Sequence, residues 1–191
     1  MKQKIAIIGT GNVGSALQKG LTRAGYEVRT AKKGQVFGAA AWADTILLAV
    51  PFGAIQDVAR ELETAADGKT VIDVTNALTP DMQLVVGFTT SGAEELQKAL
   101  PRARVVKSFN TVFAQHMSEG SVAGQQLSIF AASDDEAARK VVLELGKAIG
   151  FDAIDGGPLK NARHLEAFGY FNIQLGYVLG NGPNIGFKLV H

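Results

Sequence analysis

The sequence contains a glycine pattern whose spacing suits the binding of a dinucleotide. Gly9-Thr10-Gly11-Asn12-Val13-Gly14 follows the apolar run at residues 4–8 and opens a segment with helical periodicity. In such a pattern the first glycine permits a tight turn, the second lets a pyrophosphate approach the backbone, and the third lets helix and strand pack closely. The N–H groups at the start of the helix add partial positive charge. We therefore predict that Gly9, Thr10, Gly11, Asn12, Val13 and Gly14 bind a dinucleotide, the alternative being a glycine-rich turn without a ligand.

The segment after the second predicted strand indicates which nicotinamide dinucleotide would bind. At this place an Asp or Glu accepts a hydrogen bond from the ribose 2′-OH of NAD, whereas a cation meets the 2′-phosphate of NADP. Residues 28–34 contain no acidic residue, but Thr30 offers a hydroxyl and Lys32 and Lys33 offer positive charge. We predict NADP(H), bound in part by Thr30, Lys32 and Lys33. Two lysines in a solvated loop without a ligand are the alternative.

Three further turns each follow a predicted strand. They are Val50-Pro51-Phe52, Thr75-Asn76-Ala77 and Ser108-Phe109-Asn110-Thr111. Open α/β sheets bind ligands at the carboxyl ends of their strands, so these turns should meet at one cleft. We predict that the two asparagines donate and accept hydrogen bonds there and that the phenylalanine forms an apolar wall. The predicted lining residues are Val50, Pro51, Phe52, Asn76, Ala77, Asn110 and Thr111, although such residues also form turns that bind nothing.

Side chains suited to acid, base or nucleophilic catalysis are scarce. The sequence has no Cys, and His116, His164 and His191 stand in no recognisable triad or metal-ligand spacing. His164 and Glu166 are typical of a solvated helix face, and Lys107 is more typical of a surface lysine than of a proton donor. We predict no catalytic side chain and no metal. A hydride transfer suits this composition, because the cofactors supply the chemistry and the protein aligns them.

The elements that must position these turns alternate between strands and helices. Short apolar runs predict strands at residues 4–8, 27–30, 45–50, 70–74, 104–107, 127–131 and 152–154. Because these runs are near-continuous apolar segments and do not alternate with polar residues, we expect strands that are buried on both faces of a parallel sheet. The fold class is therefore α/β, a Rossmann-type doubly wound and mainly parallel sheet with a small C-terminal helical lobe.

Helices are predicted between these strands and after the last of them. Residues 11–23 form the first, and Ser133-x-x-Glu136 is a capping box for another that ends at Gly150. Its apolar face is predicted to contain Ala137, Val141, Leu145 and Ala148. Pro158 suits the first turn of a last helix at about residues 159–179. We divide the chain into a dinucleotide-binding domain at 1–157 and a C-terminal helix and tail at 158–191, packed as one compact unit.

Composition limits the remaining possibilities. A chain of 191 residues that is 47% hydrophobic is long enough for one well-packed domain. A formal net charge of +1 argues against nonspecific binding to nucleic acid or to an anionic membrane. The absence of Cys fits a reducing compartment, and no apolar run approaches the ~18 residues that a membrane span needs. We expect a cytoplasmic protein without a membrane or nucleic-acid partner.

Beyond the glycine pattern, the chain resembles the family of coenzyme F420-dependent NADP oxidoreductases and their bacterial relatives. The resemblance runs from Lys4 to Val190. Its most specific parts are Gly-Thr-Gly-Asn-Val-Gly at 9–14, Ala-Val-Pro-Phe at 49–52, Thr-Ser-Gly-Ala-Glu-Glu-Leu at 90–96, Val-Val-Lys-Ser-Phe-Asn-Thr at 105–111, Asp-Gly-Gly-Pro-Leu-Lys-Asn-Ala-Arg at 155–163 and Gly-Pro-Asn-Ile-Gly-Phe-Lys at 182–188. It implies a Rossmann domain that binds NADP, a C-terminal part that helps to form a deazaflavin cleft, and direct hydride transfer between two rings in a homodimer.

The resemblance also has departures. Lys32 and Lys33 stand where the family places Ser and Arg on the 2′-phosphate, and Lys lacks the bidentate fork of Arg. The connection from Lys33 to Thr45 leaves little room for the helix that the family places there. Asn110 stands where the deazaflavin enzymes can carry His, and its Phe-Asn-Thr context also resembles the cytoplasmic domain of six-transmembrane ferric reductases, which pass NADPH electrons through a flavin.

These observations lead to one hypothesis and two alternatives. The hypothesis is an NADPH-dependent oxidoreductase whose acceptor, F420 or a flavin such as FMN or FAD, lies beside the nicotinamide. Phe52, Asn76, Asn110 and Thr111, with Asn184 and Ile185 from the tail, would line the acceptor site. A flavin or ferric reductase without affinity for F420 is the enzymatic alternative. A non-catalytic NADP(H)-binding sensor is the other. A β-hydroxyacid dehydrogenase fits less well, because the chain lacks room for a large helical substrate domain.

Overall fold

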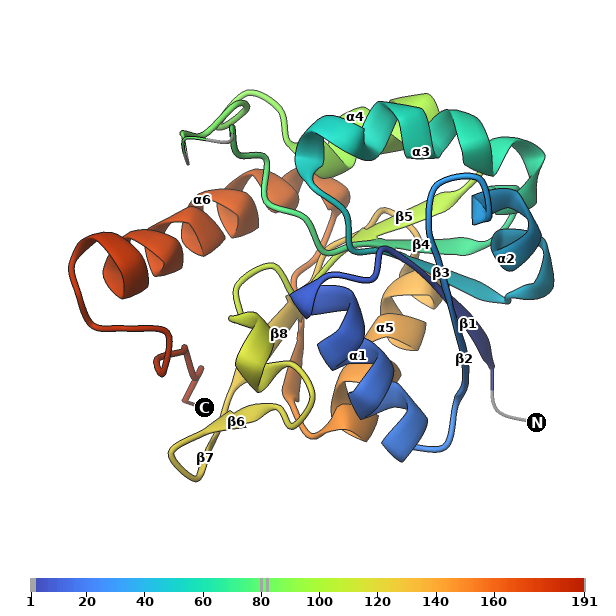
Figure 1. The fold of residues 1–191 in the computed structure, drawn as a ribbon. Helices are drawn as coiled ribbons and strands as arrows, with labels where there is room; N and C mark the ends of the chain where they lie inside the picture. The colour runs from blue at the N-terminus through green and yellow to red at the C-terminus, as the bar shows by residue number, and fades with distance from the viewer. Residues whose placement is uncertain (1–2, 80, 82, 191) are drawn as a thin grey trace.

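A parallel β-sheet forms the centre of the molecule (Figure 1). The computed structural model describes residues 3–79, 81 and 83–190. Five strands lie in the order β2-β1-β3-β4-β5, and every neighbouring pair is parallel. The strands are β1 (Lys4–Ile8), β2 (Glu27–Ala31), β3 (Thr45–Leu48), β4 (Thr70–Asp73) and β5 (Arg104–Lys107). The predicted α/β class and parallel sheet are confirmed.

Helices cover both faces of the sheet (Figure 1). On one face lie α1 (Asn12–Arg23) and α5 (Glu136–Ile149), and on the other lie α2 (Val36–Trp42), α3 (Ile55–Leu62) and α4 (Gly92–Ala99). Alternate residues of β1 point into opposite cores: Ile5 and Ile7 pack on the α1 side, and Ala6 and Ile8 on the α2 side. All four are buried. This two-sided burial explains why β1, β3, β4 and β5 are largely apolar. The expectation of burial on both faces was wrong for the edge strand β2, whose residues 27–30 alternate between exposed and half-buried.

The second half of the chain adds a small parallel pair and a long terminal helix. The pair is β8 (Ser128–Ala131) and β9 (Asp152–Asp155), and an isolated bridge between Lys107 and Ala132 connects it to β5. A short antiparallel hairpin consists of β6 (Ser121–Val122) and β7 (Gln125–Gln126). A 3₁₀ turn at Leu159–Asn161, α6 (Ala162–Ile173) and a π-helical turn at Gln174–Val178 follow without a break, which confirms the predicted last helix. Three further 3₁₀ turns are Phe52–Ala54, Glu63–Ala66 and Ala114–His116.

Three predictions about helices need correction. The connection after Lys33 does hold a helix, α2, which fits because it has only 7 residues. The N-cap of α5 is Asp135, whose carboxylate accepts from the Ala138 N–H at 2.8 Å. Ser133 instead donates to the Val105 carbonyl at 2.6 Å and so lies outside the helix. With the start of the helix shifted, the buried face consists of Ala138, Val142, Leu145, Gly146 and Ile149, and of the predicted four only Leu145 is buried.

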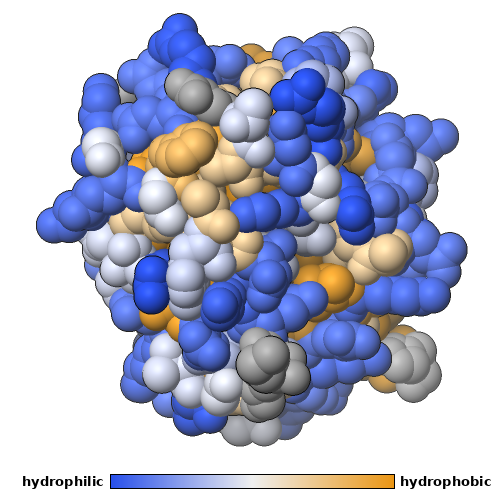
Figure 2. Space-filling model, turned by 90° about the vertical axis from the view of Figure 1, so that its right-hand side faces the viewer, coloured by the Kyte–Doolittle hydropathy of each residue, from blue (hydrophilic) through white to orange (hydrophobic). Residues whose placement is uncertain are grey.

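The surface is mostly polar on the side that carries α2. Figure 2 shows that hydrophilic residues dominate this face and that hydrophobic residues form small separate groups. Phe37 on α2 is an exposed apolar side chain, and others gather at the end of the terminal helix, where Tyr177, Val178 and Leu179 are each more than half exposed. In the described part of the chain, the helices are all too short or too polar to cross a membrane.

Candidate functional site

The glycine loop after β1 combines close backbone packing with one open position. Gly9 has a φ of +115°, and a Cβ at this residue would lie 2.1 Å from the Ala49 carbonyl oxygen. A Cβ at Gly14 would lie 2.2 Å from the Gly9 carbonyl oxygen. At Gly11, by contrast, a Cβ would meet no protein atom within 4 Å. The outer glycines are therefore required by packing, whereas Gly11 faces open space.

The open side of the loop is also the N-terminus of α1. Gly11 is the N-cap and has no side chain to satisfy the N–H groups of the first turn. These groups lack partners within the helix, and together with the helix dipole they favour an anion. The loop follows β1, whose neighbours in the sheet are β2 on one side and β3 on the other. The strand order therefore reverses at β1, and open α/β sheets bind ligands at such a reversal.

A first cavity of about 250 Å³ lies between the glycine loop, the end of β2 and α3. It brings together Gly9, Thr10, Lys32, Lys33, Val50 and Pro51 from the predicted set. Val36, Ala54 and Val58 add apolar surface, and Asp57 and Glu61 add two carboxylates. Ala31, and not the predicted Thr30, lines this cavity from β2. The cavity therefore has an apolar wall suited to a base and charged groups on its rim.

Two more cavities continue the first along the carboxyl ends of the strands. The second, about 300 Å³, shares Val50 and Pro51 with the first and adds Gly11, Asn12, Val13, Phe52 and Asn76. The third, about 250 Å³, shares Asn12, Val13, Val74 and Asn76 with the second. Its other lining residues are Asn110, Val112, Phe113, Ala114, Met117, Gly169, Asn172, Ile173 and Tyr177. Because neighbouring cavities share wall residues, the three adjoin one another, and together they are called the cleft below.

Six predicted residues lie outside the cleft lining: Gly14, Thr30, Ala77, Thr111, Asn184 and Ile185. Ala77 and Thr111 are buried, at 0% and 2% exposure. The Ala77 carbonyl accepts from the Val85 N–H, and the Thr111 carbonyl accepts from the Asn172 side chain at 3.1 Å. Asn184 is exposed and Ile185 is half-buried, and neither lines the third cavity. Their neighbour Pro183 instead accepts from Gln115, which ties the tail to the turn at residues 114–116.

Asn76 and Asn110 form a hydrogen-bonded pair at the boundary of the second and third cavities. Asn110 Nδ2 donates to Asn76 Oδ1 at 3.0 Å, and Asn76 Nδ2 donates to the Asn110 carbonyl at 3.1 Å. Phe109, just before, has a φ of +62°, which is strained for a bulky residue, and its buried ring packs edge-on against Phe151. The resulting sharp turn after β5 brings Asn110 against Asn76.

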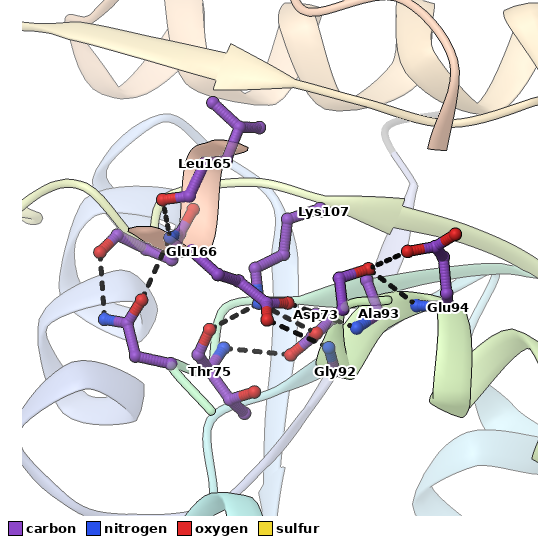
Figure 3. A network of polar contacts seen from close by, with 11 residues as sticks. Asp73, Thr75, Gly92, Ala93, Glu94, Lys107, Leu165 and Glu166 are labelled. Atoms are coloured by element: carbon purple, nitrogen blue, oxygen red, sulfur yellow. Dashed lines mark hydrogen bonds and ion pairs between the residues drawn. The ribbon is translucent and has the colours of Figure 1, made fainter. Parts of the chain in front are cut away.

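A buried ion cluster includes Asp73 and Lys107, at the ends of β4 and β5 (Figure 3). The Lys107 ammonium lies 2.9 Å from Asp73 and 3.0 Å from Glu166, and it also donates to the Thr75 carbonyl. Burial by itself would lower the pKa of Lys107, but the charges of Asp73 and Glu166 outweigh burial and raise this pKa. Lys107 is therefore held as a cation with its donors engaged. The predictions of a surface Lys107 and a solvated Glu166 were wrong, since these residues are 0% and 1% exposed.

Glu166 also fastens α6 to the rest of the molecule. Its carboxylate accepts from the Gly92 N–H at 2.9 Å and the Ala93 N–H at 3.2 Å, at the N-terminus of α4 (Figure 3). One turn earlier, Arg163 makes a two-point pair with Glu94, at 2.9 and 2.7 Å. The sequence carried no local signal for Glu166, because its partners come from other elements.

Neither His116 nor His164 lines the cleft. His116 is buried, and its Nε2 lies 3.0 Å from the Pro183 carbonyl oxygen. His164 is exposed on α6, as predicted. His191 lies outside the described residues.

Comparison with known proteins relates this site to one family. Residues 4–36 and 30–77 match the family model described as NADP oxidoreductase, coenzyme F420-dependent. A provisionally assigned F420-dependent NADP reductase from Arthrobacter sp. FB24 superposes on 99% of this chain and 100% of its own, with a TM-score of 0.91 and 27% identity. Residues 4–77 therefore resemble the coenzyme F420-dependent NADP oxidoreductases in sequence, and the likeness to the Arthrobacter protein extends this resemblance to nearly the whole fold. The glycine loop, Lys32, Lys33 and Asn76 lie within the matched region.

Other relatives extend the comparison to metal reductases. The metalloreductase STEAP3 of Rattus norvegicus is 33% identical to this chain over 100 residues, and the metalloreductase STEAP2 of Homo sapiens is 32% identical over 99. Each match covers 52% of this chain but only 20% and 19% of the relative. The chain therefore spans about a fifth of the length of these curated relatives.

Proposed function

We propose that this protein transfers a hydride between NADP(H) and a flat ring acceptor, either the deazaflavin F420 or a flavin. The main support for the proposal is that the cavity beside the glycine loop adjoins the cavity beside α6, with Asn12, Val13, Val74 and Asn76 as their shared wall. A donor and an acceptor ring placed in adjoining cavities would lie in contact. Hydride transfer needs that contact and the exclusion of water more than it needs an acid or base.

The donor half of the cleft suits a nicotinamide dinucleotide. We assign the pyrophosphate to the first turn of α1 at Gly11 and Asn12, where the backbone N–H groups have no side-chain cap. The adenine would lie against Val36, Pro51 and Val58 in the first cavity. The nicotinamide would enter the second cavity beside Val13, Phe52 and Asn76.

The acceptor half suits a ring that is apolar on its face and polar at its edge. Val112, Phe113, Met117, Ile173 and Tyr177 provide apolar surface in the third cavity. The amides of Asn76, Asn110 and Asn172 provide donors and acceptors on its inner side. Such a mixture is typical of sites for heterocyclic cofactors.

The protein's own part in the reaction is alignment. NADPH supplies the hydride from its C4, the acceptor ring takes up the electron pair, and a proton from solvent completes the reduction where one is needed. Lys107 does not serve as that proton donor, because it is buried and bound to Asp73, Glu166 and the Thr75 carbonyl. The Asn76–Asn110 pair and the Gly169 backbone of α6 would fix the width of the third cavity.

A flavin-linked reductase of the metalloreductase type is the second candidate. It is favoured by the 33% identity with STEAP3 over 100 residues. In this case a flavin would occupy the third cavity and pass electrons to a further acceptor.

A parallel assay separates these functions. Purified protein receives NADPH with oxidised F420, with FMN, or with no acceptor, and NADH serves as the control donor. The proposal predicts acceptor-dependent oxidation of NADPH with F420 or FMN, and reduction of FMN alone selects the second candidate. NADPH that binds without reducing either ring would indicate a non-catalytic sensor and would refute the proposal.

A further inference from the structure

A carboxylate from α3 reaches the loop that follows β2. Glu61 Oε2 accepts a hydrogen bond from the Gly34 N–H at 2.9 Å, so it lies directly beside the Lys32-Lys33 segment. Glu61, Lys32 and Lys33 all line the first cavity. Glu61 and Gly34 are 27 residues apart in the sequence, which is why inspection of residues 28–34 alone finds no acid there.

A second carboxylate lies on the same side of the cavity. Asp57, one turn before Glu61 on α3, lies 3.9 Å from the Lys33 ammonium and pairs with Arg60. The charged residues that line the first cavity are thus Lys32 and Lys33 against Asp57 and Glu61, which balance formally. A cavity built to select a 2′-phosphate would carry a net positive charge. This one does not.

We infer that Glu61 determines the nucleotide specificity of this site. From α3 it supplies the carboxylate that NAD-dependent enzymes place at the end of the second strand, where it accepts from the ribose 2′-OH. The same carboxylate repels a 2′-phosphate, and the two lysines offset that repulsion without the bidentate geometry that arginine would provide. The site consequently accepts both NADH and NADPH. This inference rests on the proposed dinucleotide site.

The substitution Glu61→Gln tests the inference without disturbing the fold. Glutamine has the same size, and its amide oxygen can still accept from the Gly34 N–H. Titration calorimetry of the full chain would give the dissociation constants for NADPH and NADH, at low and at physiological salt. We expect the wild type to bind the two within about tenfold of each other. Glu61→Gln should bind NADPH several-fold more tightly and NADH several-fold more weakly, changing their ratio by roughly tenfold at low salt and less at higher salt.

Two further variants make the result specific. Glu144→Gln removes an exposed carboxylate from α5, which does not line the first cavity, and should leave the ratio unchanged. Asp57→Asn should change the ratio in the same direction as Glu61→Gln but less, because Arg60 already neutralises part of its charge.

The outcomes separate this inference from the proposed function. An unchanged NADPH to NADH ratio in Glu61→Gln, with both nucleotides still bound, overturns the role of Glu61 and leaves the dinucleotide site standing. Wild-type protein that binds neither nucleotide overturns the site itself, and the inference with it.

Discussion

The Lys107 ammonium lies 3.0 Å from the Glu166 carboxylate, and this buried pair joins the end of β5 to α6. Asp73 at the end of β4 lies on the other side of Lys107, at 2.9 Å. One turn of α6 beyond Glu166, Gly169 lines the third cavity of the cleft. The pair therefore holds the wall of the proposed acceptor site in its place on the sheet.

Replacement of Lys107 by Met should destabilise the protein strongly. The substitution keeps much of the side-chain volume but leaves Asp73 and Glu166 buried without a cation, which costs about 3–5 kcal/mol when one partner of a buried pair is removed. Urea unfolding at neutral pH measures the change. Lys140→Met breaks an ion pair with Glu136 whose side chains are 68% and 69% exposed, and it should change the midpoint very little. Equal stability of the two variants would contradict the assignment of a buried cluster.

A low pH should weaken the pair of Glu94 and Arg163, which attaches α6 to α4. The hydrogen bond from Arg163 is the largest influence on this carboxyl and lowers its pKa below the ordinary value of 4.5. A carboxyl whose pKa is lower in the folded state stabilises the fold above the unfolded pKa, and that contribution disappears as the pH falls through the folded pKa. Unfolding measured from neutral pH down to below 4.5 should show a smaller loss of stability in Glu94→Gln than in the wild type. Parallel curves for the two proteins would refute the prediction.

Two glycine substitutions in the same loop should have opposite effects. Gly11→Ala places a methyl group in open space where the pyrophosphate is proposed to approach, so it should abolish NADPH binding and leave the melting temperature nearly unchanged. Gly9→Ala forces a Cβ to within 2.1 Å of the Ala49 carbonyl oxygen at a positive φ, so it should destabilise the fold by more than about 1 kcal/mol. Calorimetric binding and thermal unfolding check both. Normal NADPH affinity in Gly11→Ala would show that the pyrophosphate does not bind at Gly11.

Replacing Lys32 and Lys33 together by Ala should weaken NADPH more than NADH. Charge-assisted bonds to a phosphate in a desolvated loop would contribute on the order of 2 kcal/mol. The Lys33 side chain is 84% exposed, however, so solvent screening reduces the expected difference to about 1 kcal/mol. Dissociation constants for both nucleotides give the answer. An equal loss of affinity for NADPH and NADH would show that the lysines do not contact the 2′-phosphate.

Gly169→Ala should affect the acceptor and spare the donor. A Cβ there would lie 2.6 Å from Asn76 Oδ1 and 2.7 Å from the Asn110 carbonyl oxygen, so α6 would have to move away from the asparagine pair. We expect the acceptor-dependent rate to fall about tenfold or more, because small misplacements in hydride transfer are costly, while NADPH binds as in the wild type. Gly38→Ala in α2, where a Cβ meets nothing within 4 Å, is the matched control. A normal rate in Gly169→Ala would place the acceptor elsewhere.

The strands, the glycine loop and the turns after the strands could be predicted from the sequence because each depends on local signals. β1, β3, β4 and β5 are largely apolar because both faces of the sheet are buried there. The glycine loop has a fixed spacing because a Cβ at Gly9 or Gly14 would collide with neighbouring backbone. Turns that follow parallel strands meet at one edge of the sheet, so the positions of Val50, Asn76 and Asn110 at the cleft follow from the strands alone.

The buried ion cluster and the position of Glu61 could not be predicted from the sequence, because they depend on contacts between distant segments. Asp73 and Lys107 are 34 residues apart, and Gly92 and Glu166 are 74 apart, so nothing near Lys107 or Glu166 indicated a buried partner. Glu61 was missed for the same reason, since it approaches the loop after β2 from α3. The error at the start of α5 was of another kind, because Ser133 and Asp135 are both good N-cap residues. The Ser133 hydroxyl donates to the Val105 carbonyl, and Asp135 serves as the N-cap instead.

The transfer of deuterium from NADPH to a ring acceptor would show whether this protein passes a hydride directly between two rings. Under anaerobic single-turnover conditions the protein is mixed with oxidised F420 and with NADPH that carries deuterium on one or the other face of C4, and FMN is tested in parallel. We expect rapid reduction of a ring acceptor. With F420, deuterium should appear on the reacting carbon from only one of the two deuterated forms of NADPH. Protein that binds NADPH and reduces neither F420 nor FMN would contradict the proposed hydride transfer.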